Sequence, residues 1–308
     1  MGADVAASLK ANTILDAAME EIKRVLLPLR LFSTKFEREP RSWRGNKIIS
    51  VPYYPLETLA SRNYDQATGY TVDREAKLQA KAVTIDKRKY QDLSISSEDW
   101  NVFSDLDFEK VGRNKGRKLA EDVLIDILTI VTQANFGAAI INVAEDEFDS
   151  EELLVLDKAA IDLFWPVGDR GLILNSSLDH FVKRDPQARY AAYSGDSGVW
   201  RNASLGNRLA GFNYECSAVL PANGERLAGF MVFPSAILVG MTYIEPEPSV
   251  REKLTAFEVM ADEEVGITLA YRQWGDPDAD VGRRIIECTY GFAKGEDKAL
   301  RRITTPVV

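Results

Sequence analysis

Residues 107–137 have the sequence DFEKVGRNKGRKLAEDVLIDILTIVTQANFG, in which apolar residues recur three and four positions apart. This spacing predicts one long amphipathic helix from Asp107 to Asn135, ended by Gly137. At about 1.5 Å per residue such a helix is roughly 40 Å long. The positions expected to form its buried stripe are Leu119, Val123, Ile127 and Val131. A helix of this length needs a broad apolar partner, and we expect a sheet beneath it.

The first turns of this predicted helix are basic. The cations concerned are Lys110, Arg113, Lys115, Arg117 and Lys118. Positive charge at a helix N-terminus opposes the helix dipole, so the dipole does not explain the cluster. These five cations form either a solvated face or a contact with another subunit or with nucleic acid, and the sequence does not decide between these possibilities.

The expected sheet comes from the last third of the chain. Residues 265–274 (VGITLAYRQW) and 282–295 (GRRIIECTYGFAKG) are rich in β-branched and aromatic residues and are joined by GDPDAD, which predicts a long strand pair. Further strands are expected at 171–175, 210–220 and 228–233, a helix at 151–164, and a short buried helix at 234–242. This order predicts an α+β protein with segregated lobes.

The first hundred residues differ from the rest. Thr13 and Asp16 suggest a capping box for a helix that ends before Pro28, followed by a turn-rich extended connection to residue 46. Residues 47–97 predict a long two-stranded excursion with little apolar face of its own. Because an isolated hairpin is marginal in water, we expect this excursion to lie on a neighbouring chain.

Composition excludes several classes of protein. The chain has 308 residues, 45% of them apolar, and a formal net charge of −9, which predicts a well-cored soluble protein without a dominant basic face. No stretch suggests a membrane span or a signal peptide, so we expect the chain to stay in the cytoplasm where it is made. Cys216 and Cys288 are far apart, and we expect both to be buried, reduced thiols.

One stretch suggests catalysis, GLILNSSLDHF (171–181), because serines precede the single histidine, His180. The spacing of Ser176 and Asp179 instead predicts a capping box at a helix start, and the glycines of a hydrolase nucleophile motif are missing. A serine hydrolase built on Ser176 or Ser177 and His180 is a remote alternative. The acidic run at 145–154 lacks the pattern of a calcium loop, and we expect a solvated helix start. We therefore expect no enzyme activity, no cofactor and no metal.

The elements, taken in order, resemble the major capsid proteins of tailed bacteriophages with the HK97-type fold. The resemblance covers nearly the whole chain and rests on layout together with the loose motifs FWPVGDRGLILNSSLDHFVK, GFNYECSAVLPANGERLAGFMVFPSAILVGMTYIEP and YGFAKGEDKALRRI. It implies an N-terminal arm at 1–46 and an extended loop at 47–97. It also implies a peripheral domain at 98–145 and 249–308, with the long helix as its spine, and an axial domain at 146–248.

The resemblance also implies a function and partners. Many copies would form hexamers and pentamers that close into an icosahedral head around double-stranded DNA, assembled in the host cytoplasm with a portal and possible separate scaffolding or decoration proteins. An encapsulin-like compartment that encloses an enzyme is the nearest alternative. The intersubunit candidates of the extended loop are Arg62, Asp65, Arg74, Lys77, Lys81 and Lys87. Plain solvation of these charges stays open, as does a covalent crosslink from Lys77, Lys81, Lys87 or Lys89. The candidates for phosphate contacts are Lys10, Lys23 and Arg24.

Overall fold

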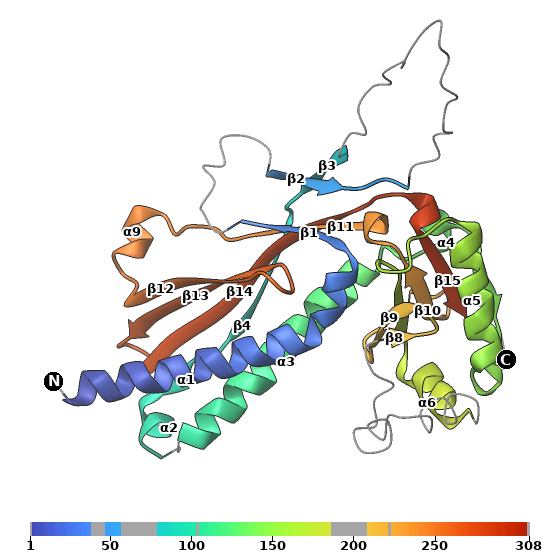
Figure 1. Ribbon diagram of the computed structural model, residues 1–308. Helices are drawn as coiled ribbons and strands as arrows, with labels where there is room; N and C mark the ends of the chain where they lie inside the picture. The colour runs from blue at the N-terminus through green and yellow to red at the C-terminus, as the bar shows by residue number, and fades with distance from the viewer. Residues whose placement is uncertain are drawn as a thin grey trace, which may run out of the picture.

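The computed structural model describes residues 2–37, 47–56, 79–102, 105–185, 208–220 and 223–306. Two lobes lie side by side, each built on its own sheet (Figure 1). The larger sheet has seven strands in the order β1-β11-β14-β13-β12, with β4 and β5 also paired to β14, and the smaller has six in the order β6-β15-β10-β7-β9-β8. The α+β fold class is confirmed.

The strands of the larger sheet are β1 (Ser33–Phe36), β4 (Lys87–Asp92), β5 (Ile95–Ser96), β11 (Ile237–Thr242), β12 (Ala256–Asp262), β13 (Ile267–Asp276) and β14 (Val281–Lys294). β13 and β14 form the predicted long hairpin, and the turn between them ends at Asp280, which has a positive φ. All pairs in this sheet are antiparallel except β1 with β11.

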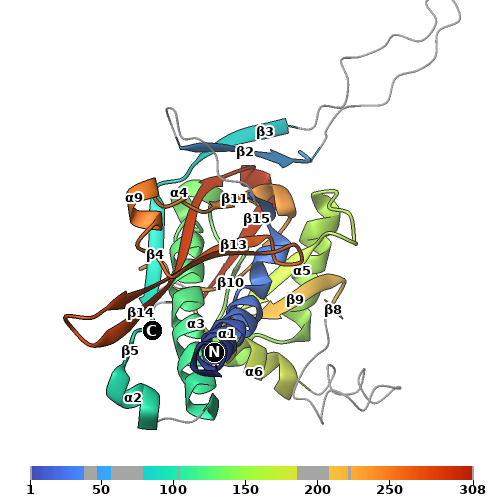
Figure 2. The ribbon, with the colours of Figure 1, turned by 90° about the vertical axis from the view of Figure 1, so that its left-hand side faces the viewer.

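Two long helices, α1 (Gly2–Val25) and α3 (Asp105–Leu128), run side by side beneath this sheet (Figures 1 and 2). Their backbones touch at two glycines of α3. A Cβ on Gly112 would lie 2.4 Å from the Ile14 carbonyl oxygen, and one on Gly116 would lie 2.5 Å from that of Ala18. Glycine is therefore required at both positions, because any side chain would push α1 away.

Leu119, Val123, Ile127 and Val131 are buried in the main core. The helix ends at Leu128 instead of Asn135, so Val131 lies in the turn before the short α4 (Gln133–Phe136), which Gly137 ends with φ +81°. The short α2 (Ser97–Val102) precedes α3, and α9 (Pro248–Arg251) precedes β12.

The strands of the smaller sheet are β6 (Ile141–Asn142), β7 (Gly171–Leu174), β8 (Arg208–Leu209), β9 (Phe212–Cys216), β10 (Leu227–Val232) and β15 (Leu300–Thr304). Two helices flank it, α5 (Ser150–Asp162) and α6 (Ser176–Arg184). Asp149 and Glu152 form a capping box at the start of α5, in agreement with the helix start expected in the acidic run.

Four expectations for the arrangement of the chain are corrected. Residues 234–242 form a 3-10 turn, η3 (Pro234–Ala236), followed by strand β11, because two neighbouring strands pair with this segment. Helix α1 begins near Gly2, so Thr13 lies inside it. The connection after α1 contains a 3-10 turn, η1 (Leu27–Leu31), and strand β1. Residues 87–96 belong to the larger sheet and not to the excursion.

The chain passes between the two sheets twice in its last third, and neither passage is at residue 248, where the axial domain was expected to end. The chain leaves the smaller sheet at η3 to form β11 in the larger one, and β14 leads back through η4 (Asp297–Ala299) to β15. A further 3-10 turn, η2 (Glu145–Glu147), precedes α5. This double crossing and one continuous apolar core join the lobes into a single body. Among the described residues, no helix has the length and apolar character that a membrane crossing requires.

Candidate functional site

The most distinctive feature of the surface is a small two-stranded sheet that stands above the larger sheet (Figures 1 and 2). It consists of β2 (Ile48–Tyr53) and β3 (Gln79–Thr84), paired antiparallel from Ile48 with Thr84 to Tyr53 with Gln79. We call this sheet the hairpin root, because residues 54–78 connect its two strands. The segment that should reach a neighbour therefore starts from a pair of strands with a fixed register.

The hairpin root has a small core of its own, contrary to the expectation of little apolar face. Ile49, Val51, Val83 and Ile85 are buried against Leu238 of β11. Four such side chains stabilise the seating of the root by about 1.5–3 kcal/mol each as an upper estimate. The root is therefore anchored on its own chain, and only the segment beyond it is left to contact another.

The hairpin root rests on two glycines that lie opposite each other in neighbouring strands of the larger sheet, and we call this surface its seat. Gly240 of β11 lies directly opposite Gly291 of β14 in the sheet. A Cβ on Gly291 would be 1.9 Å from the Thr84 carbonyl oxygen, and one on Gly240 would be 3.1 Å from the Ile85 side chain. Because glycine has no side chain, the root can lie directly on the backbone of the sheet at this point.

Polar contacts fix the edges of the root. Lys81 Nζ donates to the Lys294 carbonyl at 2.6 Å, and Lys35 Nζ donates to the Ser50 carbonyl at 2.9 Å. At the open end, Glu296 accepts hydrogen bonds from the Leu56 amide at 3.1 Å and from Ser235 Oγ at 2.8 Å. The chain thus leaves the root in a defined direction.

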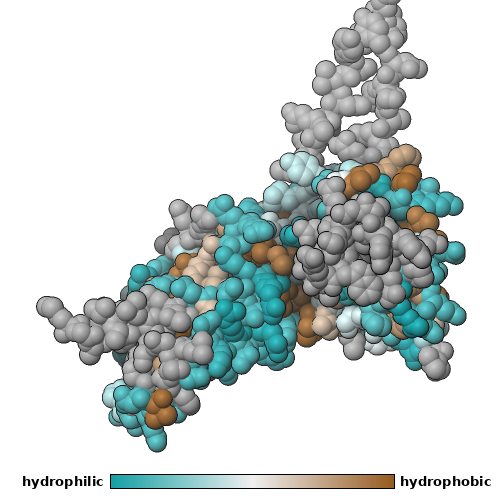
Figure 3. Space-filling view, turned by 60° about the horizontal axis from the view of Figure 1, so that its bottom comes forward, coloured by the Kyte–Doolittle hydropathy of each residue, from teal (hydrophilic) through white to brown (hydrophobic). Residues whose placement is uncertain are grey.

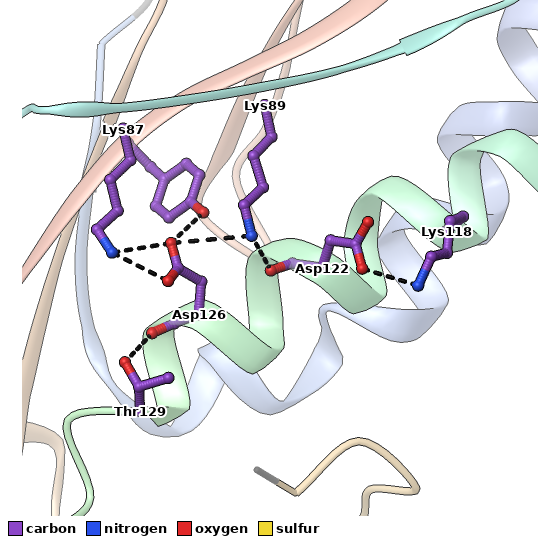
Figure 4. A network of polar contacts seen from close by, with 7 residues as sticks. Lys87, Lys89, Lys118, Asp122, Asp126 and Thr129 are labelled. Carbon is purple, nitrogen blue, oxygen red and sulfur yellow. Dashed lines mark hydrogen bonds and ion pairs between the residues drawn. The ribbon is translucent and has the colours of Figure 1, made fainter. Parts of the chain in front are cut away.

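A second cluster, which we call the spine clamp, ties α3 to the strand that follows the root (Figure 4). Lys87 Nζ of β4 lies 3.0 Å from both carboxylate oxygens of Asp126, and Tyr290 Oη donates to the same carboxylate at 2.7 Å. Lys89 Nζ donates to the Asp122 carbonyl at 2.6 Å. Lys87 and Lys81, both candidates for contacts between subunits, thus also have partners within their own chain.

Partial burial raises the pKa of Asp126, but hydrogen bonds from Tyr290 and Lys87 and the charges of Lys89 and Lys87 outweigh it and hold the pKa below its usual value. Burial and the hydrogen bond to Asp126 raise the pKa of Tyr290. The ionised carboxylate is therefore the form that holds the helix to the sheet at neutral pH.

The opposite face of β4 carries a third cluster. Glu287 of β14 is only 3% exposed, and it pairs with Arg88 and with Arg272, whose Nε lies 3.0 Å away. These residues border a cavity of about 540 Å³ that is also lined by Tyr90 and Trp274. The alternating charges of β4 are therefore neutralised on both faces of the sheet.

The remaining candidates are placed as follows. Arg62, Asp65, Arg74 and Lys77 lie outside the described residues, as does the side chain of Lys10. Lys23 pairs with Asp262 at 2.6 Å, and Arg24 pairs with Glu21 at 2.8 Å.

Much of the basic start of α3 is also ion-paired. The pairs are Lys110 with Asp107, Arg113 with Glu20 and Glu109, Arg117 with Glu121, and Lys118 with Asp122. These pairs reduce the positive charge that this face presents.

The cap of α6 is Asn175 and not Ser176. The Asn175 side chain accepts from the Leu178 amide at 2.8 Å, which makes Ser176 the first helical residue. Asp179 instead pairs with Lys183 at 2.6 Å and accepts a hydrogen bond from Tyr214 Oη. His180 is exposed, with its ring edge-on to Phe181. Its surroundings give no support to a Ser/His pair.

Neither cysteine is in a disulfide. Cys288 is buried, as expected, and burial raises the pKa of its thiol to about 12. Cys216 is exposed, which corrects the expectation, because it is the last residue of β9, at the rim of the smaller sheet. Across the described residues, no group of three His, Cys, Asp or Glu side chains is arranged to hold a metal ion.

Comparison with solved structures finds similar folds among phage capsid proteins. The capsid protein of the cyanophage P-SCSP1u superposes with a TM-score of 0.56 at 12% identity, over 90% of this chain and 87% of that one. The mature capsid of bacteriophage PhiM1 gives 0.51 at 13% identity, over 90% and 86%. The capsid of Ralstonia phage GP4 gives 0.50 at 13% identity, over 90% and 87%.

The chain therefore has the fold of tailed-phage capsid proteins, and the resemblance to the HK97-type fold is confirmed. No protein-family model matches the sequence, and no curated protein matches it either. At 12–13% identity the similarity lies in the fold and not in the sequence.

Proposed function

We propose that this chain is the major capsid protein of a tailed bacteriophage, and that hexamers and pentamers of it close into an icosahedral head around double-stranded DNA. The fold shared with phage capsid proteins supports a structural role. The observation that carries the proposal is the hairpin root, which is seated on Gly240 and Gly291 and anchored by its own small core.

The root suits a head-to-tail assembly. A segment that starts from an anchored root and ends on the next copy makes a contact between unlike surfaces, and such contacts close into rings when the rotation permits. Interwoven interfaces of this kind bury upwards of about 2,000 Å². Arg62, Asp65, Arg74 and Lys77 lie in the connecting segment, and we propose that they contact the next copy.

Packaged DNA would be held without sequence preference through its phosphates. The face that carries α1 and the start of α3 is our candidate for the inner surface, and Lys10, Lys23 and Arg24 are its proposed contacts. Because Lys23 and Arg24 already have carboxylate partners, we expect each to contribute little to the binding. A portal and separate scaffolding or decoration proteins complete the proposed assembly.

The test is expression of the chain, alone and then with its neighbouring genes, followed by size-exclusion chromatography and negative-stain electron microscopy. The proposal predicts closed shells of uniform diameter in at least one preparation, with nuclease-protected double-stranded DNA when the packaging genes are present. Shells filled with a protein cargo would favour an enzyme-enclosing compartment. Small discrete particles in every preparation would refute a shell protein.

A further inference from the structure

The outer side of the smaller lobe exposes an unusual number of large apolar side chains. Of the ten that are exposed among the described residues, five lie between positions 154 and 167: Leu154, Val155, Ile161, Phe164 and Val167. Leu154 and Ile161 are seven residues apart on α5, and they share one face of the helix with the exposed Lys158. Figure 3 shows a largely hydrophilic surface with hydrophobic groups on the right-hand lobe and where the lobes meet.

A left-handed backbone conformation directs the side chain of Phe164 into solvent. Phe164 has φ +57° and is 89% exposed, whereas the next residue, Trp165, is 2% exposed and packs near Phe233. A bulky residue in the left-handed region is an outlier with a conformational cost. The left-handed turn ends α5, because the amides of Phe164 and Trp165 donate to the carbonyls of Ile161 and Ala160, each at 2.9 Å, and glycine is the usual residue at such a position. The phenyl ring itself gains nothing for the isolated chain, because it projects into solvent.

A buried arginine holds this turn in place. Arg170 is 4% exposed, donates to the Trp165 carbonyl from Nε at 3.0 Å and from Nη2 at 2.7 Å, and pairs with Asp157 of α5 at 2.7 Å. The end of α5 and the turn that follows it are therefore rigid. A rigid aromatic on a surface is the usual form of an interface anchor.

Phe164 also borders a hollow of about 930 Å³ that reaches the hairpin root. Leu163, Phe164 and Pro166 line one side of it, and Tyr54 and Leu56 line the other. Tyr54 is 75% exposed at the point where the chain leaves β2. Whatever covers the hollow must touch both the smaller lobe and the start of the connecting segment.

We propose that the exposed apolar side chains of residues 154–167, together with the adjoining hollow, form the surface on which a second copy of this chain docks. The inference rests on the proposed function, in which the connecting segment contacts the next copy, and Tyr54 and Leu56 at the start of that segment line this hollow. A stable interface needs about 800 Å² per partner, and one aromatic supplies about 150–250 Å². Phe164 therefore supplies only part of such an interface, and the contact has to continue through the hollow to the root, which lies beside the segment proposed to contact the next copy.

The decisive variant is Phe164→Gly. Glycine adopts a positive φ without cost, so the folded chain should be as stable as the wild type or more stable, while the docking ring is lost. We expect at least a tenfold fall in the yield of assembled particles, with an unchanged or higher melting temperature. Val250→Ser is the matched control, since Val250 is also exposed but lies on α9 beside the larger sheet. It should assemble normally.

A labelling experiment locates the contact. Ile161→Cys in a Cys216→Ser background should react with a maleimide in the unassembled chain and be protected in assembled particles, while Val250→Cys should react in both. Assembly of Phe164→Gly at the wild-type yield, or equal labelling of Ile161→Cys before and after assembly, would overturn the docking surface alone. A wild-type chain that never assembles would overturn the proposed function and the docking surface together.

Discussion

Replacing Gly291 by alanine tests the seat of the hairpin root. In an ordinary strand this change is mildly favourable, because glycine costs about 0.5–1 kcal/mol relative to alanine in the middle of a strand. Here the new Cβ would start 1.9 Å from the Thr84 carbonyl oxygen, and such contacts do not occur below about 3.0 Å. The root must therefore move by about 1 Å or the strand must bend.

The expected loss of stability in Gly291→Ala is estimated from the side chains that the root buries. Complete loss of the seat would expose Ile49, Val51, Val83 and Ile85, at an upper cost of about 6–12 kcal/mol for four side chains at about 1.5–3 kcal/mol each. A shift of about 1 Å keeps most of this burial, so the expected cost is that of an overpacked core, about 1–3 kcal/mol. The direction of the connecting segment changes with the root, so assembly should suffer more than stability does.

Urea denaturation of the unassembled chain measures the first effect, and the yield of closed particles measures the second. Gly275→Ala is the matched control, because Gly275 is also a strand glycine and nothing lies within 4 Å of the position of its Cβ. The control should be neutral or slightly stabilising. The account of the seat would be refuted by a Gly291→Ala chain that is as stable as the control and assembles as well.

Three further predictions concern other parts of the fold. Gly116→Ala should destabilise the chain by about 1–3 kcal/mol in urea denaturation, because its Cβ would meet the Ala18 carbonyl of α1. The control Asn114→Ala, on the exposed side of α3, should be neutral or stabilising. Equal stability of the two variants would contradict the close contact between the helices. Asp126→Asn should lower the free energy of unfolding by about 1–3 kcal/mol at pH 7. Folding lowers the pKa of Asp126, so its contribution to stability is complete above the unfolded pKa near 3.8 and is lost as pH falls below that value. The difference in unfolding free energy between wild type and variant should therefore be smaller at pH 3 than at pH 7. An equal difference at both pH values would refute the charge-based account. Asn175→Ala should cost about 1 kcal/mol of stability and Ser176→Ala much less, and the reverse order in thermal denaturation would restore Ser176 as the cap.

Long periodic elements were predictable from the sequence. The pair β13–β14, the buried stripe of α3 and helix α5 each contain enough residues for the pattern to be clear. Short elements were not. Residues 237–242 (ILVGMT) contain no charged residue and only one polar residue, Thr242, and such a run fits a buried helix as well as a buried strand. Its identity depends on β1 and β14, which are remote in sequence.

Strands rich in charged residues are also difficult to assign to a sheet from the sequence alone. In β4, Lys87 and Lys89 alternate with Arg88, a pattern that suggests solvent on both faces. The strand lies within a sheet because Asp126 neutralises one face and Glu287 the other. Such partners are visible only in three dimensions, so the sequence alone predicts that this strand belongs to the excursion.

The glycines that decide the fold were visible in the sequence but carried no local signal of their role. Gly112 and Gly116 weaken a helix by propensity, yet they are required because α1 crosses there. Gly240 and Gly291 lie in strands whose pairing brings them opposite each other. A glycine inside a regular element therefore indicates a close backbone approach, and the sequence does not say which segment approaches.

The most direct test of the central claim is a cryo-electron microscopy reconstruction of the particles that the purified chain forms. The account predicts an icosahedral shell into which this fold fits with the two lobes intact, the connecting segment of each copy lying on the next copy, and residues 154–167 covered at the contact. A chain that forms no closed particle, or particles in which the hairpin root meets no neighbour, would contradict it.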